Sequence, residues 1–444
     1  MDNKNFCEPR DFEGSDSRRI QLAVDEAKRT GKNVVIIPRL TPEGKEFWEI
    51  DKTILLPSDI TLVLDNCCLR MADGVICQML RNSLAHTPEG TKKENVQRNI
   101  HIIGKGNAVL CGGNDNGLSE HTSGKNGFPH VRENLTIYFH NVENFSVEGI
   151  TVKDQRWWAM AFMYARFGRI ENINFELSGE LSEMGWWKDT WRNQDGIDLR
   201  VGCNNISISN ITGQTGDDVI ALTALNGINE REEKVEGLSP DIHDVSIKNI
   251  FATSVYCAIV RLLNHQRNKI YNIVMDNIHE HGEGKLRSQT AVRMGDFGYA
   301  AGKGEDALIR HGELFNISIS NMFVRSMVGI QVDTTVKNLH VNGLYLTGEA
   351  QHIMAFGTRG SEKDIITQFN INVEPHYTTA ENVIVENVCY EAEHKCVMPP
   401  EALFAFQNLD ARNFKVKNLT SNKTIEKVRE YNSLPEKGEK VIFE

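Results

Sequence analysis

Two short acidic motifs lie 22 residues apart near the middle of the chain, Asn193-Gln194-Asp195-Gly196 and Gly216-Asp217-Asp218. If the fold brings them together, three carboxylates converge on one patch, and their mutual repulsion raises the pKa of at least one of them. A carboxylic acid that keeps its proton at neutral pH can act as a general acid, with a neighbouring carboxylate as the base. An acid and a base on either side of one bond are what glycoside hydrolysis requires.

Both motifs have a plainer interpretation, because Asp-Gly and Gly-Asp-Asp are common in turns. For any one of them a structural turn is favoured. Two motifs at the same place in a repeated strand pattern favour a functional site instead.

The elements that position these motifs follow from a repeated pattern. An apolar residue, any residue, a second apolar residue, two spacers and a third apolar residue recur in eight copies between Phe145 and Leu419. The alternation predicts short strands, and asparagine predicts bends with a left-handed backbone. The chain contains 40 asparagines, and in many copies one of them precedes the last apolar residue: Asn210, Asn249, Asn277, Asn321, Asn387 and Asn418.

The spacing of the copies indicates one structural repeat of about 22 residues plus insertions. A second family of short apolar strands falls between them, such as Gly196–Val201, Asp218–Thr223 and Cys257–Leu262. Two or three strands per repeat without helical spacers predict an all-β chain folded as a parallel β-helix. A β-propeller is disfavoured, since its blades need roughly 40–50 residues and hairpin turns. Stacked asparagine amides can bond along a β-helix at the ~4.8 Å strand spacing.

One amphipathic helix is expected near the start, from Ser17 to Thr30, where it would cover the open end of the coil. We therefore predict a single β-helix domain over 1–444, with an N-terminal cap at about 10–35, coils at about 36–422 and a C-terminal tail at 423–444.

Composition excludes several classes of protein. With 49 basic and 60 acidic residues the formal net charge is −11, which argues against a nucleic-acid partner. No apolar run is long enough to span a membrane, and the start of the chain lacks the apolar core of a signal peptide. The nine cysteines are scattered without a CxxC pair, so neither a disulfide framework nor a structural metal site is expected. These features predict a cytoplasmic protein, or a secreted one from which a signal has been removed.

The two motifs carry a family resemblance. The chain resembles glycoside hydrolase family 28, the polygalacturonases and rhamnogalacturonases, in its Asn-x-Asp-Gly and Gly-Asp-Asp motifs. The segments Gly14–Gln21, Val34–Pro38 and Asn144–Ile150 resemble other parts of that family. The resemblance implies a right-handed single-stranded, pectin-lyase-like β-helix and inverting hydrolysis without a metal or other cofactor. It also implies that Asp217 is the general acid and that Asp195 and Asp218 hold and deprotonate the attacking water.

Two departures from the family pattern bear on the substrate. The family's Gly-His-Gly should fall near Val255–Ala258, where there is no histidine, and its Arg-Ile-Lys aligns best with Arg293-Met294-Gly295, which lacks the lysine. Specificity for galacturonate is therefore left open. Arginine can compensate, because its guanidinium matches a carboxylate at two points. The candidate substrate contacts are Asn193, Arg200, Tyr256, Arg261, Arg293 and Trp187.

Among these candidates, Arg200, Arg261 and Arg293 are predicted to point outward as a cationic strip, with solvation of an exposed face as an equal alternative. Trp187 belongs to a group of five tryptophans within 35 residues, at Trp157, Trp158, Trp186, Trp187 and Trp191. Indoles beside a cleft are good platforms for sugar rings, although Trp157 is expected only to pack.

The sequence thus predicts a glycosidase acting on a pectin-like or other acidic oligosaccharide or polysaccharide, with a second copy of the chain as a possible partner. Two alternatives stay open. A polysaccharide lyase or epimerase could use the same scaffold, and a β-helix of this kind could bind carbohydrate without catalysis.

Overall fold

The computed structural model describes most of the chain in two compact units. One unit comprises Met1–Asp218 and Ile228–Ser239, and the other comprises Val219–Gly227 and Pro240–Glu444. Within them the structure describes residues 5–125, 127–178, 193–255, 257–265, 267–280, 287–295, 309–348, 352–357, 378–392, 402–407, 409–422, 426–431 and 441–444. That the chain forms one continuous domain stays a prediction.

Unit 1 contains two sheets of stacked parallel strands. The strands of the long-strand sheet are β1 (Val34–Pro38), β2 (Phe47–Ile50), β4 (Ile60–Asp65), β5 (Cys68–Met71), β7 (Gln97–Lys105), β8 (Val109–Cys111), β10 (Val142–Lys153), β12 (Arg166–Glu176) and β14 (Asn204–Thr215). Those of the short-strand sheet are β3 (Ile54–Leu56), β6 (Leu80–Asn82), β9 (Ile137–His140), β11 (Met160–Met163) and β13 (Ile197–Arg200).

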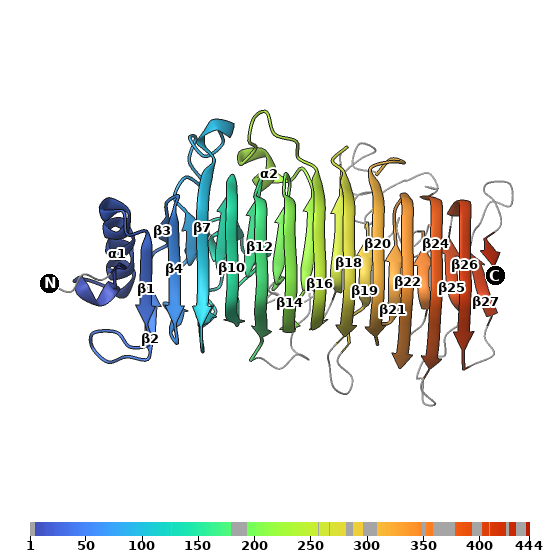
Figure 1. Cartoon of the computed structure of the whole chain (residues 1–444), viewed down its shortest axis with the longest axis horizontal. Coiled ribbons are helices and arrows are strands. Elements are labelled where there is room, and N and C mark those ends of the chain that lie inside the picture. Colours follow the sequence, from blue (N-terminus) through green and yellow to red (C-terminus); the bar gives the residue numbers. More distant parts are fainter. Residues whose placement is uncertain are drawn as a thin grey trace. The chain divides into compact units, whose positions relative to one another are not determined.

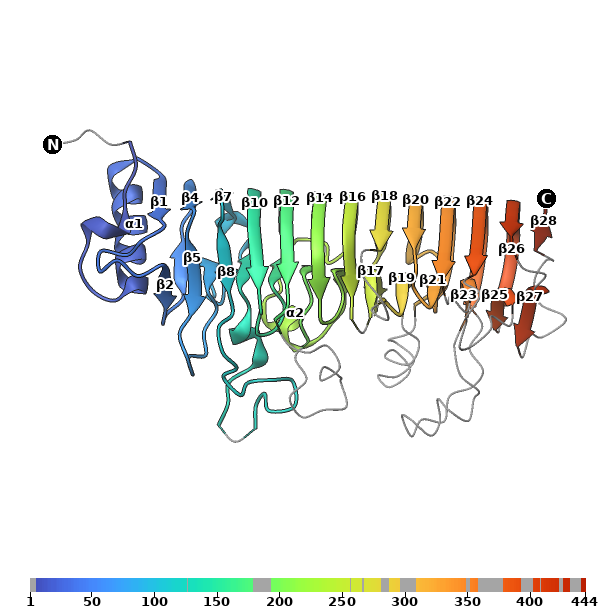
Figure 2. The same cartoon turned by 90° about the horizontal axis from the view of Figure 1, so that it is seen from below.

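Unit 2 repeats this arrangement, and Figure 2 shows its long and short strands in two separate rows. Its long-strand sheet contains β16 (Ile242–Ser254), β18 (Ile270–Glu280), β20 (Leu314–Val324), β22 (Val336–Gly348), β24 (Thr378–Ala392), β26 (Leu409–Ser421) and β28 (Ile442–Phe443). Its short-strand sheet contains β15 (Ile220–Ala224), β17 (Ala258–Asn264), β19 (Thr290–Met294), β21 (Val328–Val332), β23 (His352–Phe356), β25 (Ala402–Gln407) and β27 (Glu426–Tyr431).

The predicted all-β, parallel β-helical class is confirmed in both units. Each strand pairs in parallel with the equivalent strand of the next repeat, as the side-by-side arrows of Figure 1 show. The apolar residues of the repeat point inward and form the core; in β18, for example, Ile273, Met275 and Ile278 are fully buried. No helix in the described part of the chain is long and apolar enough to cross a membrane.

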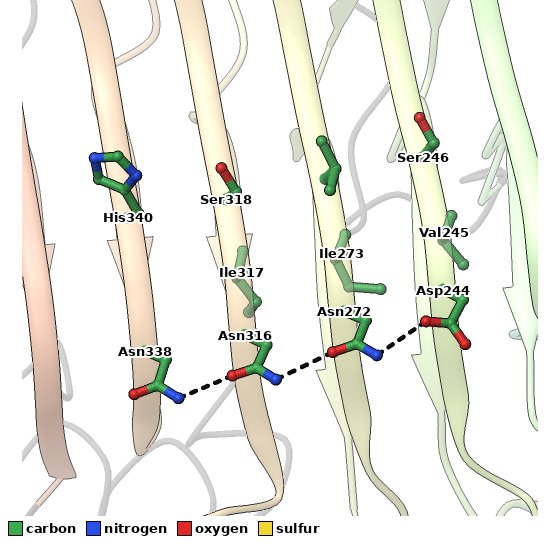
Figure 3. Close-up of a pocket in the computed structure, with 11 residues that line it drawn as sticks. Asp244, Val245, Ser246, Asn272, Ile273, Asn316, Ile317, Ser318, Asn338 and His340 are labelled. Carbon is green, nitrogen blue, oxygen red and sulfur yellow. Dashed lines mark hydrogen bonds between the residues drawn. The ribbon is translucent and has the colours of Figure 1, made fainter.

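Asparagine ladders mark the bends of the long strands. The six asparagines predicted to adopt a left-handed backbone all have φ between 50° and 59°. A second ladder, which the sequence did not indicate, runs along unit 2 one residue before the first apolar residue of the repeated pattern, as Asn272 precedes Ile273. In it Asn272 donates to Asp244 at 2.9 Å, Asn316 to Asn272 at 3.1 Å and Asn338 to Asn316 at 2.8 Å. Figure 3 shows these amides in a row, beside a groove of about 590 Å³ on the outer face of the sheet.

Replacing one ladder residue tests both roles of asparagine. We expect Asn316→Ala to lower the free energy of unfolding by roughly 2–3 kcal/mol, because it removes two hydrogen bonds and places a Cβ residue at a φ of 55°. Asn316→Gly should cost about 1 kcal/mol less, since glycine adopts this backbone without strain. Urea unfolding of the two variants measures the difference; equal losses would show that the backbone conformation contributes nothing.

The predicted N-terminal helix is confirmed. Helix α1 (Asp16–Thr30) buries Ile20, Ala23, Val24 and Ala27 and ends at Gly31, whose φ is 71°. Left-handed glycine after the last turn is a common helix stop. Figure 1 shows α1 at the end of the unit 1 strand stack, beside β1.

Two predictions about the remaining elements are wrong. Coils do not stop at residue 422, because β27 pairs with β25 and β28 pairs with β26 within the predicted tail. The described residues also contain a second α-helix, α2 (Ile228–Glu232), which was not predicted from the sequence. At five residues it is too short to produce a helical period.

Candidate active site

The structure brings Asp195 and Asp217 together in unit 1. The backbone N–H of Asp218 donates to Oδ1 of Asp195 at 2.7 Å and to Oδ1 of Asp217 at 3.0 Å. Two carboxylates therefore share one donor. An oxygen of Asp217 also lies within 4.8 Å of an oxygen of Asp218. The convergence of three carboxylates expected from the 22-residue spacing is present.

Hydrogen bonds of the main chain fix these residues. Gly196 N–H donates to the carbonyl of Asp218 at 2.9 Å, which sets one repeat against the next. The carbonyl of Gln194 accepts from Gly216 N–H at 3.2 Å and from Asp217 N–H at 3.4 Å. A Cβ on Gly216 would lie 3.1 Å from the Cβ of Gln194, so a larger residue there would push this turn apart.

A pair of glutamines supports the same turn from the preceding repeat. Gln194 Nε2 donates to the carbonyl of Gln155 at 2.6 Å, and Gln155 Nε2 donates back to the carbonyl of Gln194 at 3.3 Å. Both side chains are almost completely buried. The sequence did not indicate this pair, since the glutamines lie 39 residues apart and Gln155 belongs to no motif.

Burial gives the site its electrostatic character. Asp195, Asp217 and Asp218 are only 5%, 9% and 2% exposed. Carboxylates removed from water act on one another and on a bound substrate more strongly than exposed ones do. This arrangement suits proton transfer at a confined position.

Asn193 lies at the edge of this site and is half-buried. Its amide Nδ2 donates to Oε1 of Glu120 at 3.0 Å. The structure therefore adds the exposed Glu120 to the neighbourhood of the aspartates, a residue that no sequence motif indicated. A role for Asn193 in substrate binding stays a prediction.

Arg200 does not form part of an exposed strip. Its side chain points to the outer face of the sheet, as predicted, but is only 7% exposed. Its Nε donates to Oε1 of Glu230 at 3.0 Å, and its guanidinium lies 4.4 Å from the ring centre of Trp158. The predicted exposure is wrong because the segment that carries Glu230 covers this face. Contact of Arg200 with substrate stays a prediction.

Arg261 and Arg293 follow the predicted alternation in unit 2. They are neighbours in register on β17 and β19, and both are partly exposed between buried apolar residues. Arg293 also forms an ion pair with Asp333 at 3.4 Å. Two members of the predicted cationic strip thus lie on adjacent strands, while Tyr256 and Trp187, the other candidate contacts, lie outside the described residues.

Trp157 and Trp158 pack rather than stand free. Their rings stack with centres 3.9 Å apart and planes at 16°. Packing of Trp157, at 3% exposed, was expected. Trp158 follows it, just before β11, and its segment lies beside that of Asp195, since Ala159 N–H donates to the carbonyl of Asp195 at 2.9 Å.

A second apolar core covers the outer face of the short-strand sheet in unit 1. All residues of β9, β11 and β13 are buried, whereas β12 and β14 alternate between buried and exposed. The covering cluster joins the outer side chains of these strands to residues of the connecting segments: Ala85, Leu118, Val131, Leu135, Tyr138, Trp157, Trp158, Ala161, Met163, Tyr164, Val201 and Val235. Polar or small side chains would be expected there if the face met water.

Residues 228–239, here called the strap, form one layer of this cover. Three of its acids pair with bases of unit 1. Glu230 binds Arg200, Glu232 binds Nη1 of Arg132 at 2.7 Å, and Glu233 binds His86. The backbone carbonyl of Glu233 also contacts Nε2 of His140 at 2.6 Å. The run Glu230-Arg-Glu-Glu233 was the available sequence signal, and it reads like an ordinary solvated segment.

The charges under the strap depend on pH. Burial lowers the pKa of His140 from its ordinary value of 6.5, despite the nearby Glu233. Burial opposes the charge of Glu233, but the hydrogen bond from His86 and the nearby charges of His140, His86 and Arg132 together hold its pKa below 4.5. Burial also raises the pKa of Tyr138, which stacks on His86, well above 10.

We expect unit 1 to lose stability as the pH falls below 6.5. The unfolded state then binds a proton on His140 that the folded state refuses, so stability present above pH 6.5 is lost on acidification, by on the order of 1 kcal/mol. Glu233 adds a loss of the same sign below pH 4.5. Urea unfolding between pH 7.5 and 5.5 measures this, and His140→Asn should flatten the slope. An unchanged slope would contradict the role of His140.

Comparison with known proteins identifies one family and several solved structures with a similar fold. Residues 89–237 match the family model described as glycosyl hydrolases family 28, so the resemblance predicted from the aspartate motifs is confirmed in the segment that holds them. No curated protein gives a significant match to the sequence.

Among solved structures, the family 28 exopolygalacturonase of Yersinia enterocolitica is 14% identical, covering 98% of this chain and 77% of its own, with a TM-score of 0.54. A surface adhesin of Streptococcus pneumoniae is 12% identical over 96% and 92% of the two chains, also at 0.54. The tailspike of Escherichia coli bacteriophage HK620, solved with a pentasaccharide, is 11% identical over 99% and 78%, again at 0.54. At these identities the likeness establishes the fold alone.

Proposed function

We propose that this protein is a glycoside hydrolase that cleaves a pectin-like or other acidic oligosaccharide by inverting, single-displacement hydrolysis. The observation that carries the proposal is the single Asp218 N–H shared by the carboxylates of Asp195 and Asp217. It lies in the segment that matches glycosyl hydrolases family 28, and the parallel β-helical fold supports the same conclusion.

Asp217 serves as the general acid in this mechanism. Two carboxylates that face one donor repel each other when both are ionised, so the pair retains a proton more readily than either alone. That proton passes from Asp217 to the leaving glycosidic oxygen. Asp195 and Asp218 orient a water molecule on the opposite face of the sugar and remove its proton as the new bond forms.

The acidic substrate needs a cationic contact, and the described residues offer one in unit 2. Arg261 and Arg293 present neighbouring guanidinium groups on the outer face of β17 and β19. We propose that this pair of arginines binds a carboxylate, the role that the resemblance gives to the lysine missing from the Arg-Ile-Lys pattern. Arg293→Lys, which keeps the charge but loses the two-point contact, should raise KM with little change in kcat.

A reducing-sugar assay over pectic and neutral oligosaccharides tests the reaction. Hydrolysis releases reducing ends, forms no ultraviolet-absorbing unsaturated uronate, and persists in EDTA. An ultraviolet-absorbing product would indicate a lyase instead. Equal signals from wild type and Asp217→Asn would overturn the proposal, and sugar binding without any turnover would favour a carbohydrate-binding β-helix.

A further inference from the structure

We propose that the substrate site is closed beside β11 and β13, so that the enzyme removes units from a chain end and does not cut within the chain. This inference rests on the proposed hydrolysis. It follows from an end wall, which we define as Trp157, Trp158, Arg200 and the strap.

The first part of the wall blocks a sugar chain from extending past Asp195 toward β11 and the earlier strands. A sugar chain lying across successive strands and passing the aspartates would next meet β11 and the residues before it. The position beside Asp195, two residues before β11 begins, is taken by Trp158, which is 9% exposed and stacked on Trp157. Further back, Leu135 and Tyr138 are also buried. These buried side chains therefore occupy the outer face of β9 and the segment before β11.

The second part of the wall blocks the way along the strand that follows Asp195. The outward side chains of β13 are Asp198 and Arg200, which are 1% and 7% exposed. Arg200 contacts Asp198, pairs with Glu230 and lies over the ring of Trp158. The charged pair and the two indoles therefore form one continuous packed corner beside the aspartates.

The strap keeps this corner closed. Besides its three acid–base pairs, its backbone joins the rest of unit 1, because Glu236 N–H donates to the carbonyl of Thr91 at 3.3 Å and Val235 is fully buried. A wall held by several buried contacts stays shut at equilibrium, whereas a single exposed ion pair would not hold it. The closed side is thus a fixed property of the fold.

The product pattern of the wild-type protein on polygalacturonate tests the wall directly. An end-acting enzyme releases one short product of constant length from the first time point, while the viscosity of the polymer hardly falls. A ladder of intermediate oligosaccharides with an early loss of viscosity would overturn the end wall and leave hydrolysis in place.

Opening the wall should change this pattern. We expect Trp158→Ala to raise the ratio of internal to terminal cuts about tenfold, the order of effect that one contact has on pocket specificity. Trp158→Phe fills most of the space and should behave like wild type, and so should Phe167→Ala, an exposed residue on the other sheet. Circular dichroism melting of each variant confirms folding, and the wild-type pattern decides the question even if Trp158→Ala does not fold.

Calorimetry provides a readout that needs no turnover. With the Asp217→Asn protein and galacturonate oligomers of increasing length, end binding predicts a molar affinity that stops rising once the pocket is filled. An affinity that keeps rising with length would overturn the end wall. Neither binding nor turnover with any oligomer would overturn the proposed function and the wall together.

Discussion

Asp217→Asn is expected to lower kcat by about 10²–10⁴-fold, the usual contribution of a general acid. Asparagine fills the same space and can still contact the Asp218 N–H, but it has no proton to give to the leaving oxygen. KM should change little, because the substitution removes an interaction made in the transition state. The measurement is the release of reducing ends from the best substrate of the pectic panel.

Asp25→Asn is the matched control for this variant. Asp25 is exposed on α1 and bonded only locally to Gln21 at 3.0 Å, so its replacement should leave kcat unchanged. Both proteins should melt within a few degrees of wild type. A loss of less than tenfold in folded Asp217→Asn would show that another group donates the proton.

Arg200→Met is expected to destabilise unit 1 by about 3–5 kcal/mol, because it leaves the carboxylates of Glu230 and Asp198 buried without their cation. Arg169→Met is the surface control. Arg169 has a side chain 54% exposed and pairs with Glu148, and such pairs contribute about 0–1 kcal/mol. Urea unfolding of the two variants measures the contrast.

The double variant Arg200→Met/Glu230→Met distinguishes the cost of leaving a buried charge unpaired from the cost of displacing the strap. With both charges replaced by apolar side chains, most of the stability should return, since methionine can pack against Trp158. If the double variant is as unstable as Arg200→Met, Asp198 or the geometry of the strap carries the cost. If Arg200→Met is no worse than Arg169→Met, the buried pair is not what holds the strap.

The sequence predicted those features that repeat. Strand alternation recurs in every copy of the pattern and asparagine at fixed positions in most of them, so each copy supports the interpretation of the others. The β-helix and the register of Asp195 with Asp217 followed from these repeats, and α1 followed from its own amphipathic pattern. Arg261 and Arg293 were placed correctly for the same reason, because alternation fixes which face a strand residue occupies.

Features that occur once were not predictable in this way. Arg200 obeys the alternation, yet its exposure depends on Glu230, which lies 30 residues later in an unpatterned loop. The same holds for Gln155 and Gln194, whose reciprocal bonds have no local signal. Strands β27 and β28 were missed because their segment is polar, and pairing with the preceding coil decides their structure.

The strap has a consequence for how specificity can change over time. Its residues follow β15 in the sequence and belong to unit 1, where three of its acids form pairs. If the proposed end wall holds, a change within this one loop would alter which positions of a sugar chain are cut, at a cost in stability from the pairs that it removes. The preference for chain ends would then depend on a single loop that supplies none of the three aspartates.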